Sequence, residues 1–128
     1  MRLLIDTCSF LWFIENNPKL SATALTLIKD GNNEVMLSTA SLWEMAIKYS
    51  VGKLSLTDPF DKFIRDQLSV NNIEVLAVKI DHISIVSALP FHHRDPFDRM
   101  LIAQSTVERM PIVSSDTVFD AYKVKRLW

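Results

Sequence analysis

Glycine and cysteine are nearly absent from this chain of 128 residues, which holds only Gly31, Gly52 and the single Cys8. Two isolated glycines cannot build a Walker loop or the Gly-rich turn of a dinucleotide fold, because both need several glycines close together. One cysteine cannot form an internal disulfide, and no signal-peptide-like leader opens the sequence. These absences exclude nucleotide-cofactor chemistry of those two kinds, and they lead us to expect a cytoplasmic protein.

A long hydrophobic run and an excess of charge are also missing. The most apolar window, LLIDTCSFLWFI, is interrupted by Asp6 and is shorter than the roughly 20 residues that cross a bilayer. Lysine and arginine number 14 against 15 aspartates and glutamates, which gives a formal charge of -1. We therefore expect no membrane span, and any nucleic acid must be met by local cations rather than by an overall positive field.

The chain does contain short apolar strands that alternate with helical segments. Apolar runs predict strands over residues 2–6, 34–39, 73–78 and 111–116, with a final edge strand over 123–128. Helical spacing and capping signals predict helices over residues 8–15, 21–31, 41–54, 57–68, 81–89, 95–110 and 117–122. This alternation predicts an α/β sandwich around a mainly parallel sheet, in one domain over residues 1–128.

Four acids are placed to meet at one edge of that sheet. Asp6 ends the first strand, Asp116 ends the fourth, and Glu44 lies one helical turn past the second. Asp98 stands in the first turn of the helix that returns to the fourth strand. Because sites in open parallel sheets lie at the carboxyl ends of the strands, we expect these four carboxylates to gather there.

Each acid also has an ordinary structural explanation. Ser41 and Glu44 fit a capping box, in which the glutamate bonds back to the first amide of its helix. Asp6 and Asp116 are suited to cap the helices that follow them. Taken singly, any of the acids is more often structural than functional.

Taken together, the acids favour a metal site. Carboxylates held at one edge repel one another and raise one another's pKa, unless a cation lies among them. Oxygen ligands select hard cations, so Mg²⁺ or Mn²⁺ is expected. Such ions serve attack by water on a phosphodiester, and this chemistry is as available to DNA as to RNA.

The segments IDTC, STASLWEMAIKYSVGKL, HHRDPFDRMLIAQ and IVSSD resemble the PIN-domain ribonucleases, and most closely the VapC-type toxins of toxin-antitoxin pairs. The resemblance implies a three-layer α/β/α sandwich with a parallel sheet of order 3-2-1-4-5. It implies an Mg²⁺- or Mn²⁺-dependent endoribonuclease with catalytic acids at Asp6, Glu44, Asp98 and Asp116. Asp6, Asp98 and Asp116 would be metal ligands, although Asp95 competes with Asp98 and Asp116 has the alternative of assisting without touching metal. An RNA substrate, a cognate antitoxin and a homodimer are further implications.

The motif RDPFDRML, which holds Asp98, has a near twin in TDPFDKFI. Asp95 suits an N-cap and Pro96 the first helical position, and the same capping explanation applies to the twin, where Asp58 takes the place of Asp95. Under the order 3-2-1-4-5, Asp61 of the twin belongs to the helix that serves an edge strand, whereas Asp98 belongs beside Asp6. We therefore predict that Asp98 is functional and Asp61 structural.

The remaining polar residues carry weaker signals. Basic side chains near the proposed edge are candidates for contact with RNA phosphates, with solvated helix faces as the alternative; they are Lys48, Lys53, Arg94 and Arg99. His92 and His93 are interpreted as loop or helix-end residues, and Cys8 as a small buried thiol. Rival functions are a PIN-like module that binds RNA or protein without cutting and a receiver-type domain that is phosphorylated on Asp81.

Overall fold

The computed structural model describes residues 1–128 and contains a five-stranded sheet with helices between the strands. None of the helices combines the length and apolar character that a bilayer crossing requires. The elements in chain order are β1 (Arg2–Ile5), α1 (Thr7–Ile14), α2 (Ala22–Lys29), β2 (Glu34–Ser38), α3 (Thr39–Ser50), α4 (Phe60–Val70), β3 (Glu74–Leu76), α5 (Ile80–Ala88), α6 (Pro96–Glu108), β4 (Ile112–Val113), the 3₁₀ helix η1 (Thr117–Ala121) and β5 (Arg126–Leu127).

All pairings in the sheet are parallel, and the strand order is β3-β2-β1-β4-β5. The order 3-2-1-4-5 is thereby confirmed. Strand β1 is central, with Ile5 paired to Leu37 of β2 on one side and to Val113 of β4 on the other. Because β1 and β4 are neighbours, the residues that follow them leave the sheet at the same edge.

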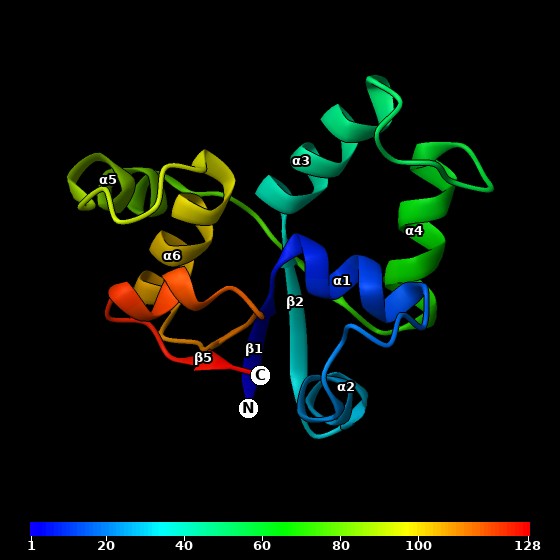
Figure 1. The fold of residues 1–128 in the computed structure, drawn as a ribbon, viewed down its shortest axis with the longest axis horizontal. Helices are drawn as coiled ribbons and strands as arrows, with labels where there is room; N and C mark the ends of the chain where they lie inside the picture. The colour runs from blue at the N-terminus through cyan, green and yellow to red at the C-terminus, as the bar shows by residue number, and fades with distance from the viewer.

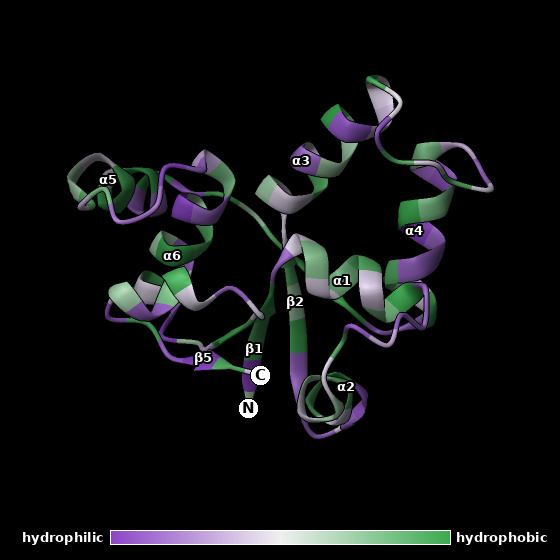
Figure 2. Ribbon diagram, in the orientation of Figure 1, coloured by the Kyte–Doolittle hydropathy of each residue, from purple (hydrophilic) through white to green (hydrophobic).

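The sheet is buried on both faces, which explains why its strands are continuous apolar runs rather than alternating ones. Leu3 and Ile5 pack into the core shared with α1, α2 and α4, whereas Leu4 points to the opposite core, built with α6 and η1. Figure 1 shows α1, α2 and α4 on one side of β1 and β2, and α5 and α6 on the other. Figure 2 shows the hydrophobic strands between these two helical layers. The three-layer α/β/α sandwich is confirmed.

Helix α3 begins two residues earlier than expected, and its predicted capping box is wrong. The N-cap is Ser38, whose hydroxyl accepts a hydrogen bond from the backbone N–H of Ala40 at 3.0 Å. Ser41 lies buried inside the helix, so it caps nothing. Glu44 is therefore free to make contacts outside its own helix, which bears on the site below.

The two DPFD segments begin their helices differently despite their shared sequence. Asp95 is the N-cap of α6 and accepts hydrogen bonds from two backbone N–H groups, those of Phe97 at 2.9 Å and Asp98 at 3.0 Å. In α4 the N-cap is Pro59, and no side chain caps the helix. The expectation that an aspartate caps the helix in both copies is thus correct for RDPFDRML at α6 and wrong for TDPFDKFI at α4.

This difference predicts unequal stability effects at the two aspartates. Asp95→Ala should be about 1 kcal/mol less stable than Asp95→Asn, because both variants lose the charge but only asparagine keeps an acceptor oxygen for the cap. The corresponding pair at Asp58 should differ by less than about 0.5 kcal/mol. Urea unfolding of the four variants measures both differences, and equal differences at the two positions would contradict the assigned caps.

Candidate functional site

The site begins where β1 and β4 leave the sheet. Asp6 follows β1 and caps α1 by accepting the backbone N–H of Ser9 at 2.8 Å. Asp116 lies three residues past β4 and caps η1 by accepting the N–H of Val118 at 2.9 Å. The structural role expected of each acid is therefore real. Beyond its cap, the Asp6 carboxylate also hydrogen-bonds with the side chains of Ser114 and Ser9, and the second oxygen of Asp116 lies 3.3 Å from the Nε2 atom of His93.

Three side chains converge most closely at this edge: His93, Asp98 and Asp116. The Nε2 atom of His93 lies 2.9 Å from an Asp98 oxygen and 3.3 Å from an Asp116 oxygen. One potential ligand atom from each residue lies within 4.8 Å of the other two. Asp6 and Glu44 surround this trio, close enough for their charges to act on Asp98.

Of the neighbouring acids Asp95 and Asp98, it is Asp98 that belongs to the group with His93 and Asp116. One oxygen of the Asp95 carboxylate accepts both hydrogen bonds of the α6 cap, whereas the Asp98 carboxylate lies 2.9 Å from Nε2 of His93. Asp61, in the other DPFD copy, is exposed on α4 and pairs with Arg65 at 2.7 Å. The structure thus places Asp98 with the acids at the sheet edge and Asp61 on the exposed face of α4.

Sequence reasoning missed His93, which was interpreted as a loop residue. Its loop runs into the Asp95 cap, and the cap places His93 at the same end of α6 as Asp98. The signal available in the sequence was that His93 lies two residues before Asp95, the expected N-cap of the helix that carries Asp98.

Glu44 points out of α3 toward α1. Its carboxylate accepts a hydrogen bond from the Thr7 hydroxyl at 2.6 Å and lies 3.1 Å from the ammonium of Lys48. Burial lowers the pKa of Lys48, but the hydrogen bond and charge of Glu44 outweigh burial and raise it. Lys48 therefore offsets one negative charge of the site, and its side chain remains partly exposed.

Burial is the main influence on two carboxylates of the site, Asp6 and Asp98. Burial raises the pKa of Asp6, although hydrogen bonds with Ser114 and Ser9 partly offset this effect. Burial, followed by the charge of Asp95, raises the pKa of Asp98 to about 7. Cys8, expected to be buried, is instead exposed on α1; partial desolvation and the charge of Asp6 raise the pKa of its thiol.

Arg99 does not face the site, and the expectation that it contacts RNA is corrected. Its side chain is only 5% exposed, and its guanidinium stacks on the Phe91 ring, 4.1 Å from the ring centroid. The guanidinium donates hydrogen bonds of 2.9 to 3.3 Å to four backbone carbonyls, those of Val86, Leu89, Pro90 and His93. A buried arginine committed to four acceptors is not available to a phosphate.

The cations that do reach the surface are fewer than expected. Arg94 is exposed in the loop before α6, and Lys53 is exposed after α3. Together with the partly exposed Lys48, these residues remain candidates for contact with a phosphate backbone.

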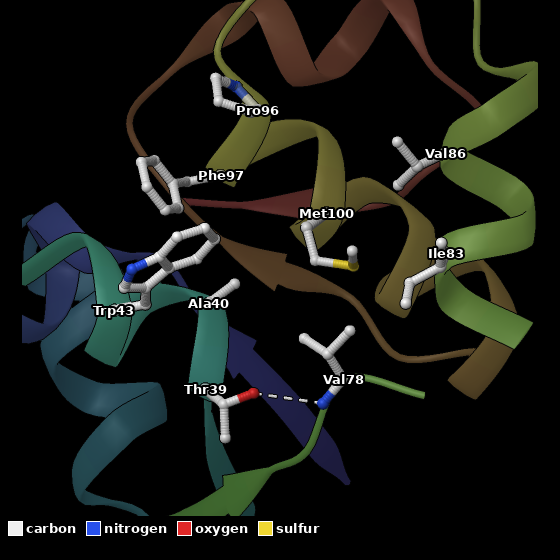
Figure 3. A pocket seen from close by; sticks show the side chains of 9 residues that line it. All are labelled: Thr39, Ala40, Trp43, Val78, Ile83, Val86, Pro96, Phe97 and Met100. Carbon is white, nitrogen blue, oxygen red and sulfur yellow. Dashed lines mark hydrogen bonds between the residues drawn. The ribbon is translucent and has the colours of Figure 1, made fainter. Parts of the chain in front are cut away.

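An apolar recess lies between α3, α5 and α6 (Figure 3). We call it the apolar groove; it measures about 580 Å³ and is lined by Thr39, Ala40, Trp43, Val78, Ile83, Val86, Pro96, Phe97 and Met100. Trp43 and Phe97 meet edge to face, with ring centroids 5.4 Å apart. Trp43 is 65% exposed. Such an exposed apolar surface is typical of a binding face.

The donor set of the site fits a hard divalent cation. Carboxylate oxygens come from Asp98 and Asp116, with Asp6 and Glu44 around them. The Nε2 atom of His93 is buried among these oxygens without a well-aligned hydrogen bond. The carboxylate oxygens thus surround a position that well-aligned hydrogen bonds leave unoccupied. Such a set of oxygens matches the preference of Mg²⁺ and Mn²⁺ for oxygen ligands.

Comparisons with known proteins agree with this architecture. The family model of the PIN domain matches residues 3–125. Ribonuclease VapC16 of Mycobacterium tuberculosis is 33% identical over 70 residues, which are 52% of this chain and 50% of that protein, so the chain matches about half the length of this relative. VapBC2 of Rickettsia felis, solved with a DNA fragment from its promoter, has a TM-score of 0.74 at 15% identity and covers 99% of this chain and 98% of that one. FitAcB of Neisseria gonorrhoeae has a TM-score of 0.66 at 15% identity, over 98% and 96% of the two chains.

The raised pKa of Asp98 predicts how stability depends on pH. Its pKa is about 7 in the folded protein and about 3.9 in an unfolded chain, so the folded state binds more protons between these values. The free energy of unfolding contributed by Asp98 therefore falls as pH rises from about 4 to about 7. In EDTA, wild type should lose more stability between pH 5 and pH 8 than Asp98→Asn does. Urea unfolding at both pH values measures this, and parallel losses would contradict the assignment.

Proposed function

The chain belongs to the PIN domain family, and on this premise we propose that it is a metal-dependent endoribonuclease, the toxin of a toxin-antitoxin pair. The observation that carries the proposal is the convergence of Asp98 and Asp116 beside Asp6, at an edge where burial raises the pKa of Asp98 to about 7. The name of the M. tuberculosis relative supports ribonuclease activity, over the part of that protein which matches.

In this proposal the four acids have different tasks. Asp98 and Asp116, together with Asp6, would hold a divalent ion at the carboxyl ends of β1 and β4. When bound, Mg²⁺ or Mn²⁺ would supply a Lewis acid that activates water and offsets charge on the phosphate oxygens. Glu44, fixed by Thr7 and Lys48, orients the attacking water from the α3 side.

The RNA backbone would reach the acids past exposed cations. Arg94 lies in the loop that leads into α6 and its Asp98, and Lys48 lies beside Glu44. Both would neutralise phosphates that flank the cleaved bond, a role that positions the strand without reading its sequence. Choice of RNA over DNA rests on the family premise, because the ion chemistry serves both.

A cognate antitoxin and a second copy of the chain are the proposed protein partners. Solved relatives described as VapBC and FitAcB assemblies support the antitoxin. The apolar groove supports self-association, because its lining includes the half-exposed Ile83, and Ile80 of the same helix α5 is also exposed. Exposed apolar side chains next to an apolar recess suit a two-fold dimer, in which the same surface of each copy covers that of the other. A cytoplasmic location remains a prediction.

Asp6→Asn tests the activity. Asparagine can still cap α1, so the fold should persist, while loss of the charge should slow Mn²⁺-dependent cleavage of a structured RNA by about 10²- to 10³-fold. The matched control is Asp61→Asn on the exposed face of α4, which should cleave within about twofold of wild type.

Two outcomes would contradict the nuclease proposal. One is full cleavage by Asp6→Asn in a preparation free of contaminating nuclease. The other is RNA binding by wild type with no cutting in Mn²⁺, which would identify a binding module instead.

Ile83→Asp tests the pairing face. The side chain is 53% exposed at the apolar groove, so the change should leave the monomer folded while placing a charge in the interface. Sedimentation should show a dimer for wild type and a shift toward monomer, by at least about tenfold in the dissociation constant, for the variant. Val70→Asp, 80% exposed at the end of α4, is the control and should remain dimeric. A dimer unaffected by Ile83→Asp would exclude this face.

A further inference from the structure

We propose that His93 is a positioning residue of this site, whose Nε2–H group holds the Asp98 and Asp116 carboxylates together for a divalent ion without ligating the ion itself. This inference rests on the proposed function, since it concerns the same metal centre. It adds a residue that the four-acid pattern does not contain. Its basis is the hydrogen bond at Nδ1 of one imidazole ring and the two carboxylate contacts at Nε2 of the same ring.

The tautomer of His93 follows from its Nδ1 atom. The backbone N–H of Asp95 donates to Nδ1 at 3.3 Å. A backbone amide nitrogen can only donate, so Nδ1 must carry a lone pair, and the neutral ring must carry its proton on Nε2. A nitrogen that bears a proton offers no lone pair to a metal. The Nε2 atom is therefore a donor toward the carboxylates and not a ligand beside them.

The Nε2–H group is shared between the two acids. Nε2 lies 2.9 Å from an Asp98 oxygen and 3.3 Å from an Asp116 oxygen, and it is buried. Neither contact has the alignment of a full hydrogen bond. The proton thus attracts both oxygens without saturating either one, and each oxygen keeps the capacity to turn toward a cation.

The loop around His93 is held more firmly than a surface turn requires. The backbone N–H of His93 donates to the Tyr122 hydroxyl at 2.8 Å, and that hydroxyl donates to the Pro90 carbonyl at 2.7 Å. Its carbonyl accepts from the buried Arg99 at 3.3 Å, and its ring meets Phe119 edge to face. These contacts fix where the ring enters the site, as supporting residues do for metal ligands.

His92 provides a matched comparison within the same loop. It is exposed, and its ring meets Tyr122 edge to face, with centroids 5.2 Å apart. The two histidines are neighbours in the same loop, but only His93 contacts Asp98 and Asp116. A change at His92 therefore measures the effect of disturbing the loop alone.

The first test is calorimetric titration of the full chain with Mn²⁺ in the absence of RNA. His93→Leu should weaken Mn²⁺ binding by about 10- to 100-fold, the usual effect of removing a partner that orients metal ligands. His93→Gln should stay within about threefold of wild type, because its side-chain amide N–H can take the place of Nε2–H. His92→Leu should bind Mn²⁺ as wild type does.

The second test separates a donor from a ligand. Pulsed electron paramagnetic resonance of the Mn²⁺-loaded protein, with histidines labelled with ¹⁵N, should show no coupling from a directly bonded imidazole nitrogen. A strong coupling that disappears in His93→Gln would overturn the proposal, because it would make His93 a ligand. This readout does not depend on whether His93→Leu folds.

The failures of the two proposals are distinguishable. If wild type and His93→Leu bind Mn²⁺ equally, the role of His93 is overturned and the metal centre stands. If His93→Gln binds as weakly as His93→Leu, the N–H donor role is overturned. If wild type binds no Mn²⁺ at all, the metal centre and the role of His93 are both overturned.

Discussion

The burial of acidic side chains at one edge of the sheet is the constraint on which the site depends. The order β3-β2-β1-β4-β5 makes β1 and β4 neighbours, so Asp6 and Asp116 leave the sheet side by side, and α6 brings Asp98 to the same edge. Burial then raises the pKa of Asp6 and Asp98. The protein offsets this with helix caps, with Lys48 at Glu44 and with the N–H of His93, and the remaining negative charge makes the edge a place for a cation.

Much of the surrounding structure serves to hold that arrangement rigid. Arg99 is a buried charge without an acidic partner, and four backbone carbonyls satisfy it instead. Those carbonyls belong to the end of α5 and the following loop, so one side chain of α6 fixes the segment that carries His93. Tyr122 fixes the same segment from the side of β4 and β5. Sites held within narrow limits require such a supporting layer.

The sequence predicted what depends on periodicity and chain order. Apolar runs located the strands, and the position of Asp6, Asp98 and Asp116 after or beside them predicted a shared edge, because parallel strands end together. Contacts between distant segments were beyond its reach. The same DPFD sequence provides a side-chain cap for α6 but not for α4, so these four residues do not by themselves determine the cap. The sequence indicated a surface cation at Arg99 and a loop residue at His93. In the fold, Arg99 is buried and His93 lies against Asp98 and Asp116.

The most direct test of this account is a crystal structure of the protein grown with Mn²⁺, recorded at a wavelength where manganese scatters anomalously. The account predicts an anomalous peak at about 2.0 to 2.3 Å from carboxylate oxygens of Asp98 and Asp116, with Asp6 direct or bridged by water and His93 Nε2 outside ligand distance. A peak elsewhere on the molecule, or no peak at millimolar Mn²⁺ with this edge open to solvent, would contradict the claim that the clustered acids form a metal centre.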